Sequence, residues 1–138
     1  MKRILFTCIL TFSVVCAWAQ SAPKWTKKVQ KSIVSVLAYG KDGKLLHSGT
    51  GFYIDARGTA VADYSIFRDA YSASVVDASG NKSNVVRILG ADDTYGLVRF
   101  TTDAKKPVPL AIATEIPHKG SSLWTLSFSK DKITECPV

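Results

Sequence analysis

Short runs of apolar and β-branched residues follow one another from residue 32 onward at intervals of about ten residues, and turn residues separate them. The runs lie at residues 32–39, 45–55, 59–62, 73–77, 83–89 and 96–101. Between them, KDGK at 41–44 and SGN at 79–81 are typical of hairpin turns. Because no helical periodicity alternates with the runs, the pattern predicts an all-β barrel or sandwich rather than a parallel sheet.

The segment before these runs predicts one short helix over residues 21–31. Pro23 suits the first helical position, and Trp25, Val29 and Ile33 recur at helical spacing. The opposite face is basic and carries Lys24, Lys27, Lys28 and Lys31. This basic amphipathic face could meet an acidic lipid, glycan or protein partner, although a solvated face is the simpler interpretation.

The first 20 residues have the pattern of a cleavable secretion signal. Lys2 and Arg3 precede an apolar run over residues 4–15, and Ala17 and Ala19 are small at the positions that a signal peptidase reads. The apolar run is too short to span a bilayer comfortably. We therefore expect a signal peptide over residues 1–20, no integral membrane segment, and a secreted or periplasmic protein.

Composition limits what the remaining chain can be. A length of 138 residues with 46% hydrophobic and 21% charged residues fits one folded domain and excludes disorder. The formal net charge of +7 is too dispersed to favour a nucleic-acid partner. Two histidines and three cysteines, of which Cys8 and Cys16 would leave with the leader, give no spacing typical of a metal site. We expect no metal and no cofactor.

Three segments resemble the first barrel of the trypsin-like serine proteases, and the bacterial Deg/HtrA branch most of all. They are the strand at 32–39, the glycine-rich strand GTGFYID at 49–55, and GTAV at 58–61. The order and spacing of that branch continue at Gly90, Asp92, Gly96, Leu97, Pro109, Leu110 and Gly120. The resemblance covers residues 32–128. It implies a six-stranded antiparallel barrel over 32–116 and the first strand of an incomplete second barrel in a truncated tail over 117–138.

The resemblance also locates the family's catalytic positions. In that family a serine attacks the carbonyl, a histidine takes its proton and an aspartate orients the histidine. Counting from Gly49, the histidine position holds Ser65, and counting from Gly90 and Asp92, the aspartate position holds Gly96. The nucleophile belongs to a Gly-x-Ser-Gly-Gly segment of the second barrel, which the sequence lacks.

Loss of a triad member costs about 10⁴–10⁶ in kcat, so the resemblance implies no trypsin-like catalysis and no catalytic residue. The two histidines, His47 and His118, could approach an aspartate such as Asp63, but neither stands at a matched position. We expect both to be surface or strand-edge residues.

The last predicted strand, residues 122–128, is a candidate interaction surface. Its apolar residues are Leu123, Trp124, Leu126 and Phe128, and no partner strand is evident in the sequence. An apolar strand with unpaired backbone groups invites association. The chain could be a piece of a longer protein, a second copy could pair with it, or the strand could fold back onto the first barrel. Cys136 could form an intermolecular bond or stay a free thiol.

Three functions follow from these features. The one that we favour is a catalytically inactive, secreted pseudoprotease that acts as a binding or scaffold module for a protein or peptide. The second is the N-terminal half of a serine endopeptidase whose second barrel is missing from this chain. The third is a small β-barrel that binds acidic glycans or peptides, which the positive charge alone would explain.

Overall fold

The structure is a computed structural model that describes residues 24–121, 123–129 and 132–137. The expected signal peptide, with Cys8 and Cys16, lies outside these residues and stays a prediction. Among the helices of the described residues, none is long and apolar enough to cross a membrane.

The basic helix is shorter than the sequence pattern suggests. It consists of α2 (Thr26–Val29) and the 3₁₀ turn η1 (Gln30–Ser32), and it leads directly into the first strand. The amides of Lys28 and Val29 donate to the carbonyl of Trp25, which begins the helix. The lysines of this segment are exposed, whereas Thr26 and Ser32 are buried and Trp25, expected on the apolar face, is 48% exposed.

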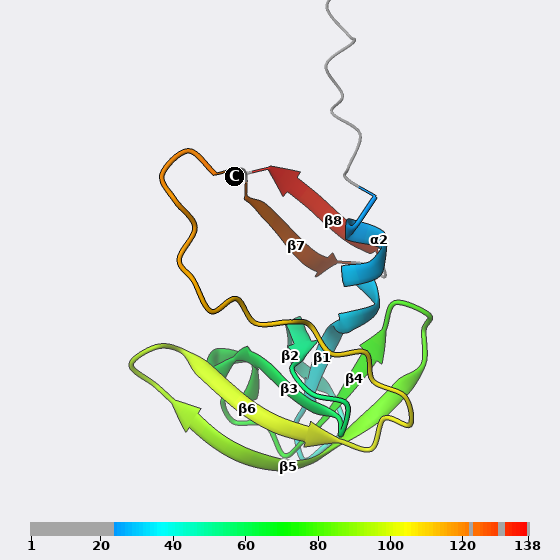
Figure 1. Cartoon of the computed structure of the whole chain (residues 1–138). Coiled ribbons are helices and arrows are strands. Elements are labelled where there is room, and N and C mark those ends of the chain that lie inside the picture. Colours follow the sequence, from blue (N-terminus) through cyan, green and yellow to red (C-terminus); the bar gives the residue numbers. More distant parts are fainter. Residues whose placement is uncertain (1–23, 122, 130–131, 138) are drawn as a thin grey trace, which may run out of the picture.

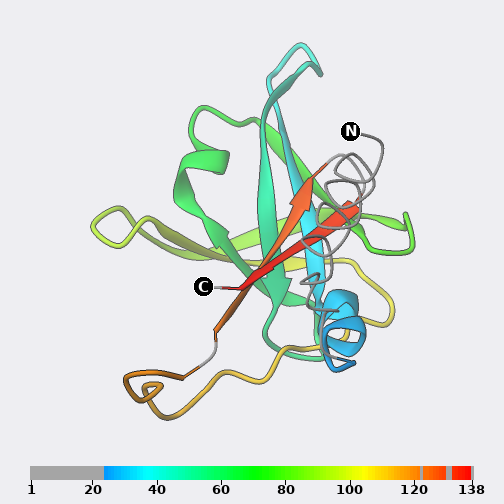
Figure 2. The ribbon, with the colours of Figure 1, turned by 90° about the horizontal axis from the view of Figure 1, so that it is seen from above.

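Six antiparallel strands close into a barrel, which confirms the fold class predicted from the sequence (Figures 1 and 2). The strands are β1 (Ile33–Tyr39), β2 (Leu45–Tyr53), β3 (Thr59–Asp63), β4 (Ser72–Asp77), β5 (Lys82–Asp92) and β6 (Leu97–Thr102). They are hydrogen-bonded in the order β1-β2-β3-β6-β5-β4, and β4 returns to β1. The pairing of β3 with β6 therefore joins two segments that are distant in the sequence.

Alternate residues of the strands fill the barrel. Val34, Val36 and Ala38 of β1 are fully buried, as are Val98 and Phe100 of β6 within about one per cent. This period of two is the pattern expected of strands with one face in a core. The core is thus built from alternate residues of the runs that predicted the strands.

A 3₁₀ turn, η2 (Tyr64–Phe67), covers one part of the core after β3. Its buried Ile66 lies directly over Gly49 of β2, where a Cβ atom would stand 2.3 Å from the Ile66 Cδ1 atom. The ring of Phe67 packs against that of Phe100, with centroids 5.1 Å apart. Gly49 therefore makes the room that lets η2 pack closely on the barrel.

The chain then leaves the barrel through an extended segment that contains no strand between residues 103 and 121. Leu110 is tied to the barrel by its amide, which donates to the carbonyl of Tyr53 at 2.8 Å. Figure 1 shows this segment, in yellow and orange, crossing the barrel and rising to the last two strands.

These last strands correct one expectation. The apolar strand β7 (Trp124–Ser129) has a partner in the chain, because β8 (Lys132–Pro137) pairs with it in antiparallel register from Trp124↔Pro137 to Ser129↔Lys132. The expectation of an unpaired strand was wrong because β8 (KITECP) mixes charged, apolar and proline residues and does not stand out as a strand. Whether the two strands open a second barrel stays a prediction.

Gly58 permits the turn that leads into β3. Its φ is +88°, its carbonyl accepts both the amide and the hydroxyl of Thr102, and a Cβ atom would lie 2.9 Å from the Thr102 carbonyl oxygen. We predict that Gly58→Ala lowers the free energy of unfolding by about 2–4 kcal/mol, through the positive φ and the overlap together.

Gly80→Ala is the matched control in a urea titration. Gly80 has a φ of +83°, but no described atom lies within 4 Å of the position of its Cβ atom. In the control, the free energy of unfolding should therefore fall only by the cost of placing alanine at a positive φ, about 1–2 kcal/mol. Equal losses in the two variants would contradict the close packing of Gly58 on Thr102.

Candidate functional site

One rim of the barrel brings together the two positions at which the sequence pattern puts the missing catalytic groups. Where β3 ends, the amide of Tyr64 donates to the carbonyl of Gly96 at 2.8 Å, and Asp63 stands opposite Leu97 in the strand register. Ser65 follows immediately in η2. Ser65 and Gly96 therefore lie at the same end of the barrel, although the whole of β4 and β5 separates them in the sequence.

The Ser65 hydroxyl is engaged with a carboxylate. Its Oγ atom donates to Oδ1 of Asp63 at 2.5 Å, and its backbone amide donates to the same oxygen at 2.7 Å. The two bonds begin the η2 turn, as an aspartate at this position commonly does. The hydroxyl, and after it the amide, lowers the pKa of Asp63 below its ordinary value.

Gly96 contributes only backbone to the rim. Its φ is +64°, and no described atom lies within 4 Å of the position that a Cβ atom would take. A side chain at this position would therefore meet open space. A carboxylate with a lowered pKa, such as that of Asp63, is a poor base near neutral pH, and a serine hydroxyl is a poorer one. Neither the Ser65 hydroxyl nor Gly96, which has no side chain, could act as a general base near neutral pH.

The two histidines do not fill this gap. His47 lies exposed on β2 opposite Ala38, and His118 lies exposed in the segment between β6 and β7. Among the described residues, neither imidazole has a hydrogen bond or ion pair with a carboxylate. Asp92 accepts the amide of Tyr95 and so caps the turn between β5 and β6. The described residues also contain no group of three or more His, Cys, Asp or Glu side chains that could hold a metal ion.

A second feature is an apolar groove of about 550 Å³ between the helix, the barrel and β7. Trp25 and Trp124 meet edge to face across it, with ring centroids 6.5 Å apart and planes at 88°. Large apolar residues of the helical segment, β1, β2, β7 and the segment before β7 line it: Trp25, Val29, Ile33, Phe52, Leu110, Leu123, Trp124 and Leu126. Trp25 is still 48% exposed and Leu123 44% exposed, so the groove is open.

The groove accounts for three of the interaction residues expected from the sequence. Leu123, Trp124 and Leu126 line it, whereas Phe128 is absent from its lining and is attached to the barrel by its amide, which donates to the Thr50 hydroxyl at 2.9 Å. Cys136 stands opposite Thr125 in the hairpin, and its side chain lies outside the described part of the chain. Sequence reasoning missed that the helical stripe of Trp25, Val29 and Ile33 forms the facing wall, although its spacing was the available signal.

The barrel and its rim have the architecture of a trypsin-like serine protease domain, and solved structures confirm this fold. The chain is similar to the serine endoprotease from Yersinia pestis, with a TM-score of 0.71, 18% identity, and coverage of 81% of this chain and 41% of that one. It is similar to the active form of a protease from M. tuberculosis, with a TM-score of 0.72, 16% identity, and coverage of 83% and 49%.

The same comparisons cover only part of each solved protease. The chain spans less than half the length of either solved protease, and at these identities the likeness shows the fold alone. No family model matches the sequence, and no curated protein matches it either. The resemblance to trypsin-like proteases is therefore confirmed at the level of the barrel.

The bond between Ser65 and Asp63 can be tested through the carboxyl titration. We predict that Ser65→Ala raises the pKa of Asp63 toward its ordinary value, because the hydroxyl is the largest cause of the lowered pKa. The measurement is the carboxyl ¹³C chemical shift against pH. Ser65→Thr, which keeps a hydroxyl, should titrate like the natural protein.

The lowered pKa of Asp63 makes the free energy of unfolding depend on pH. A carboxyl whose pKa is lowered by folding stabilises the folded state above its unfolded pKa, and this stabilisation is lost as the pH falls through its folded pKa. Ser65→Ala should therefore destabilise the protein at neutral pH more than in acid. Identical titrations of Asp63 in the alanine variant and the natural protein would contradict the bond.

Proposed function

We propose that this chain is a secreted trypsin-like domain without proteolytic activity, which acts by binding a protein or peptide. The observation that carries the proposal is the rim itself. The Ser65 hydroxyl donates a hydrogen bond to the Asp63 carboxylate, and Gly96 has no side chain, at the two places where a base and its orienting carboxylate would be needed. The barrel that supports these positions is intact.

The size of the catalytic deficit supports this choice. Removal of triad members in serine proteases leaves about 10³–10⁴-fold acceleration over water, out of an original acceleration many orders of magnitude larger. This residual activity depends on an oxyanion hole and a substrate-binding groove. The positions of the base and of its orienting carboxylate hold Ser65 and Gly96. The function that we propose for the domain is therefore binding rather than catalysis.

The apolar groove is the surface that we assign to the partner. It joins the helix, β2 and β7, and it leaves large apolar side chains accessible. Exposed apolar surface of this kind is typical of contacts with another protein. The partner would be a protein or peptide segment, a second copy of the chain, or a C-terminal half from which this chain has been separated.

The last of these partners gives a second candidate function, the N-terminal half of a serine endopeptidase. The observation in its favour is that the solved proteases are more than twice as long as the matched part of this chain. Even then the base and its orienting residue would have to come from elsewhere, because Ser65 and Gly96 occupy their positions. An in-frame Gly-x-Ser-Gly-Gly segment after Val138 in the gene would favour this candidate.

A serine-reactive probe tests the proposal. We predict that purified protein is not labelled by a fluorophosphonate and does not cleave casein above background, under conditions in which trypsin does both. The physical reason is the absence of a group that lowers the barrier to deprotonation of a serine. Labelling or cleavage that Ser65→Ala abolishes would overturn the proposal, and so would labelling of any other serine.

A further inference from the structure

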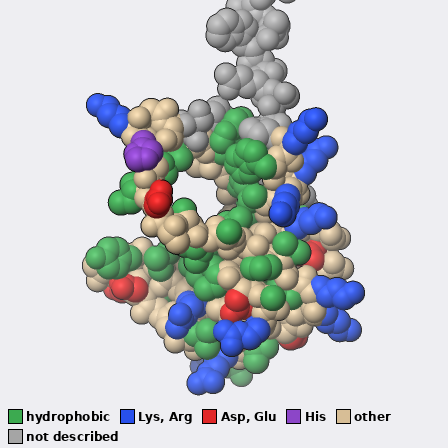
Figure 3. All heavy atoms as spheres, in the orientation of Figure 1, with side chains coloured by type: hydrophobic (Ala, Val, Ile, Leu, Met, Phe, Trp, Pro, Cys, Tyr) green, Lys and Arg blue, Asp and Glu red, His purple; other side chains and the backbone are tan. Residues whose placement is uncertain are grey.

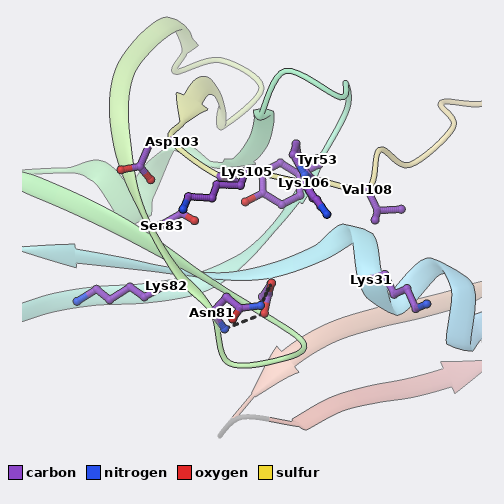
Figure 4. Close-up of a pocket in the computed structure, with 12 residues that line it drawn as sticks. Lys31, Tyr53, Asn81, Lys82, Ser83, Asp103, Lys105, Lys106 and Val108 are labelled. Carbon is purple, nitrogen blue, oxygen red and sulfur yellow. Dashed lines mark hydrogen bonds between the residues drawn. The ribbon is translucent and has the colours of Figure 1, made fainter.

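A polar pocket of about 510 Å³ opens on the barrel at a place that the apolar groove and the rim do not reach (Figure 4). It lies between the end of η1, the turn from β4 to β5, and the extended segment that follows β6. Tyr53 of β2 forms part of its wall, with its ring almost fully buried. Four lysines line it: Lys31, Lys82, Lys105 and Lys106.

Two carboxylates also line the pocket, and both accept hydrogen bonds from neighbouring residues. Asp77 accepts the amides of Ser79 and Asn81 at 2.8 and 2.9 Å, and its other oxygen accepts the Asn81 side-chain amide at 2.9 Å. Asp103 accepts the amide and the side chain of Asn84, at 2.6 and 3.1 Å. These bonds fix the β4–β5 turn and the start of the extended segment, so the carboxylates serve as structural acceptors.

Three of the lysines are left for a ligand. The Lys82 ammonium is directed to Tyr39, with Nζ 3.4 Å from the phenol oxygen and 5.1 Å from the ring centroid. Lys31, Lys105 and Lys106 are exposed and form no ion pair with a described residue. Figure 4 shows Lys31 on the helical segment and Lys105 and Lys106 on the segment that follows β6, and all three line the pocket. Such unpaired cations around a concave surface favour an anionic ligand.

The positive charge continues beyond the pocket. Lys31 belongs to the same helical segment as Lys24, Lys27 and Lys28, which are all exposed. Figure 3 shows Lys and Arg side chains along the side of the molecule on which this helix lies. A ligand longer than the pocket could therefore keep favourable electrostatic contact along the helix.

We propose that this pocket binds an acidic peptide segment, with carboxylate side chains placed among Lys31, Lys105 and Lys106. Pro107 and Val108 add an apolar wall suited to the aliphatic part of a side chain. A nucleic acid fits less well, because the pocket's aromatic ring, Tyr53, is only 3% exposed and offers no face on which a base could stack. The pocket shares no lining residue with the apolar groove, so it is a second binding surface, and this proposal goes beyond the proposed function.

Fluorescence anisotropy with a fluorescein-labelled, glutamate-rich peptide tests the site, and the glutamine-rich peptide of equal length is the ligand control. We predict that Lys105→Gln combined with Lys106→Gln weakens binding about three- to tenfold, since each exposed charge pair contributes at most about 1 kcal/mol. Lys31→Gln alone should weaken it about two- to threefold. Binding should also weaken as salt is raised.

Lys41→Gln combined with Lys44→Gln is the matched control. It removes the same charge from the turn after β1, whereas Lys31 lies just before β1, at the other end of the strand. Binding in this control should change less than about twofold if the pocket is the site. Circular dichroism checks that each variant is folded.

Four results would each overturn the proposal: an equal loss in the control variant, equal binding of the glutamine-rich peptide, no binding at all, or stronger binding of a sulfated polysaccharide than of the acidic peptide. None of them bears on the serine-reactive probe. Failure of this site can therefore be told apart from failure of the proposal that the domain is catalytically silent.

Discussion

The pairing of β3 with β6 is the constraint on which the rest of the structure depends. It closes the barrel between strands that are not neighbours in the sequence, and the bond from the Tyr64 amide to the Gly96 carbonyl extends this pairing beyond the end of β3. Closure leaves no free edge between these strands and fixes the distance across the rim. Any chemistry at the rim is therefore set by which side chains the chain carries at a few fixed positions.

At those positions the chain carries groups that stabilise local structure. Ser65 and Asp63 start the η2 turn, and the left-handed backbone of Gly96 ends the turn between β5 and β6. Both features serve folding, and neither provides a proton acceptor near neutral pH. The barrel has a trypsin-like fold, and the two surfaces that we propose as binding sites, the apolar groove and the lysine-lined pocket, lie away from the rim.

Much of the barrel could be predicted from the sequence because the strands carry a local signal, short runs of apolar and β-branched residues between turn residues. The partner of β7 could not be predicted, because β8 mixes polar, charged and apolar residues and its pairing with β7 is seen only in the folded structure. The lysine-lined pocket was missed for a related reason. Lys31 and the pair Lys105 and Lys106 are far apart in the chain, and only closure of the barrel brings them to one opening.

The central claim of the proposal is that Ser65 and Gly96, which lie at the same rim of the barrel, occupy the positions of a histidine and its orienting aspartate. Its most direct test is the pKa of the imidazole introduced by Ser65→His, measured by NMR with and without Gly96→Asp. A facing carboxylate stabilises the imidazolium, so the account predicts a pKa higher by about one unit or more in the double variant. Gly96→Asn, which adds no charge, should leave the imidazole pKa near that of the single variant. The same pKa with aspartate as with asparagine would contradict the claim.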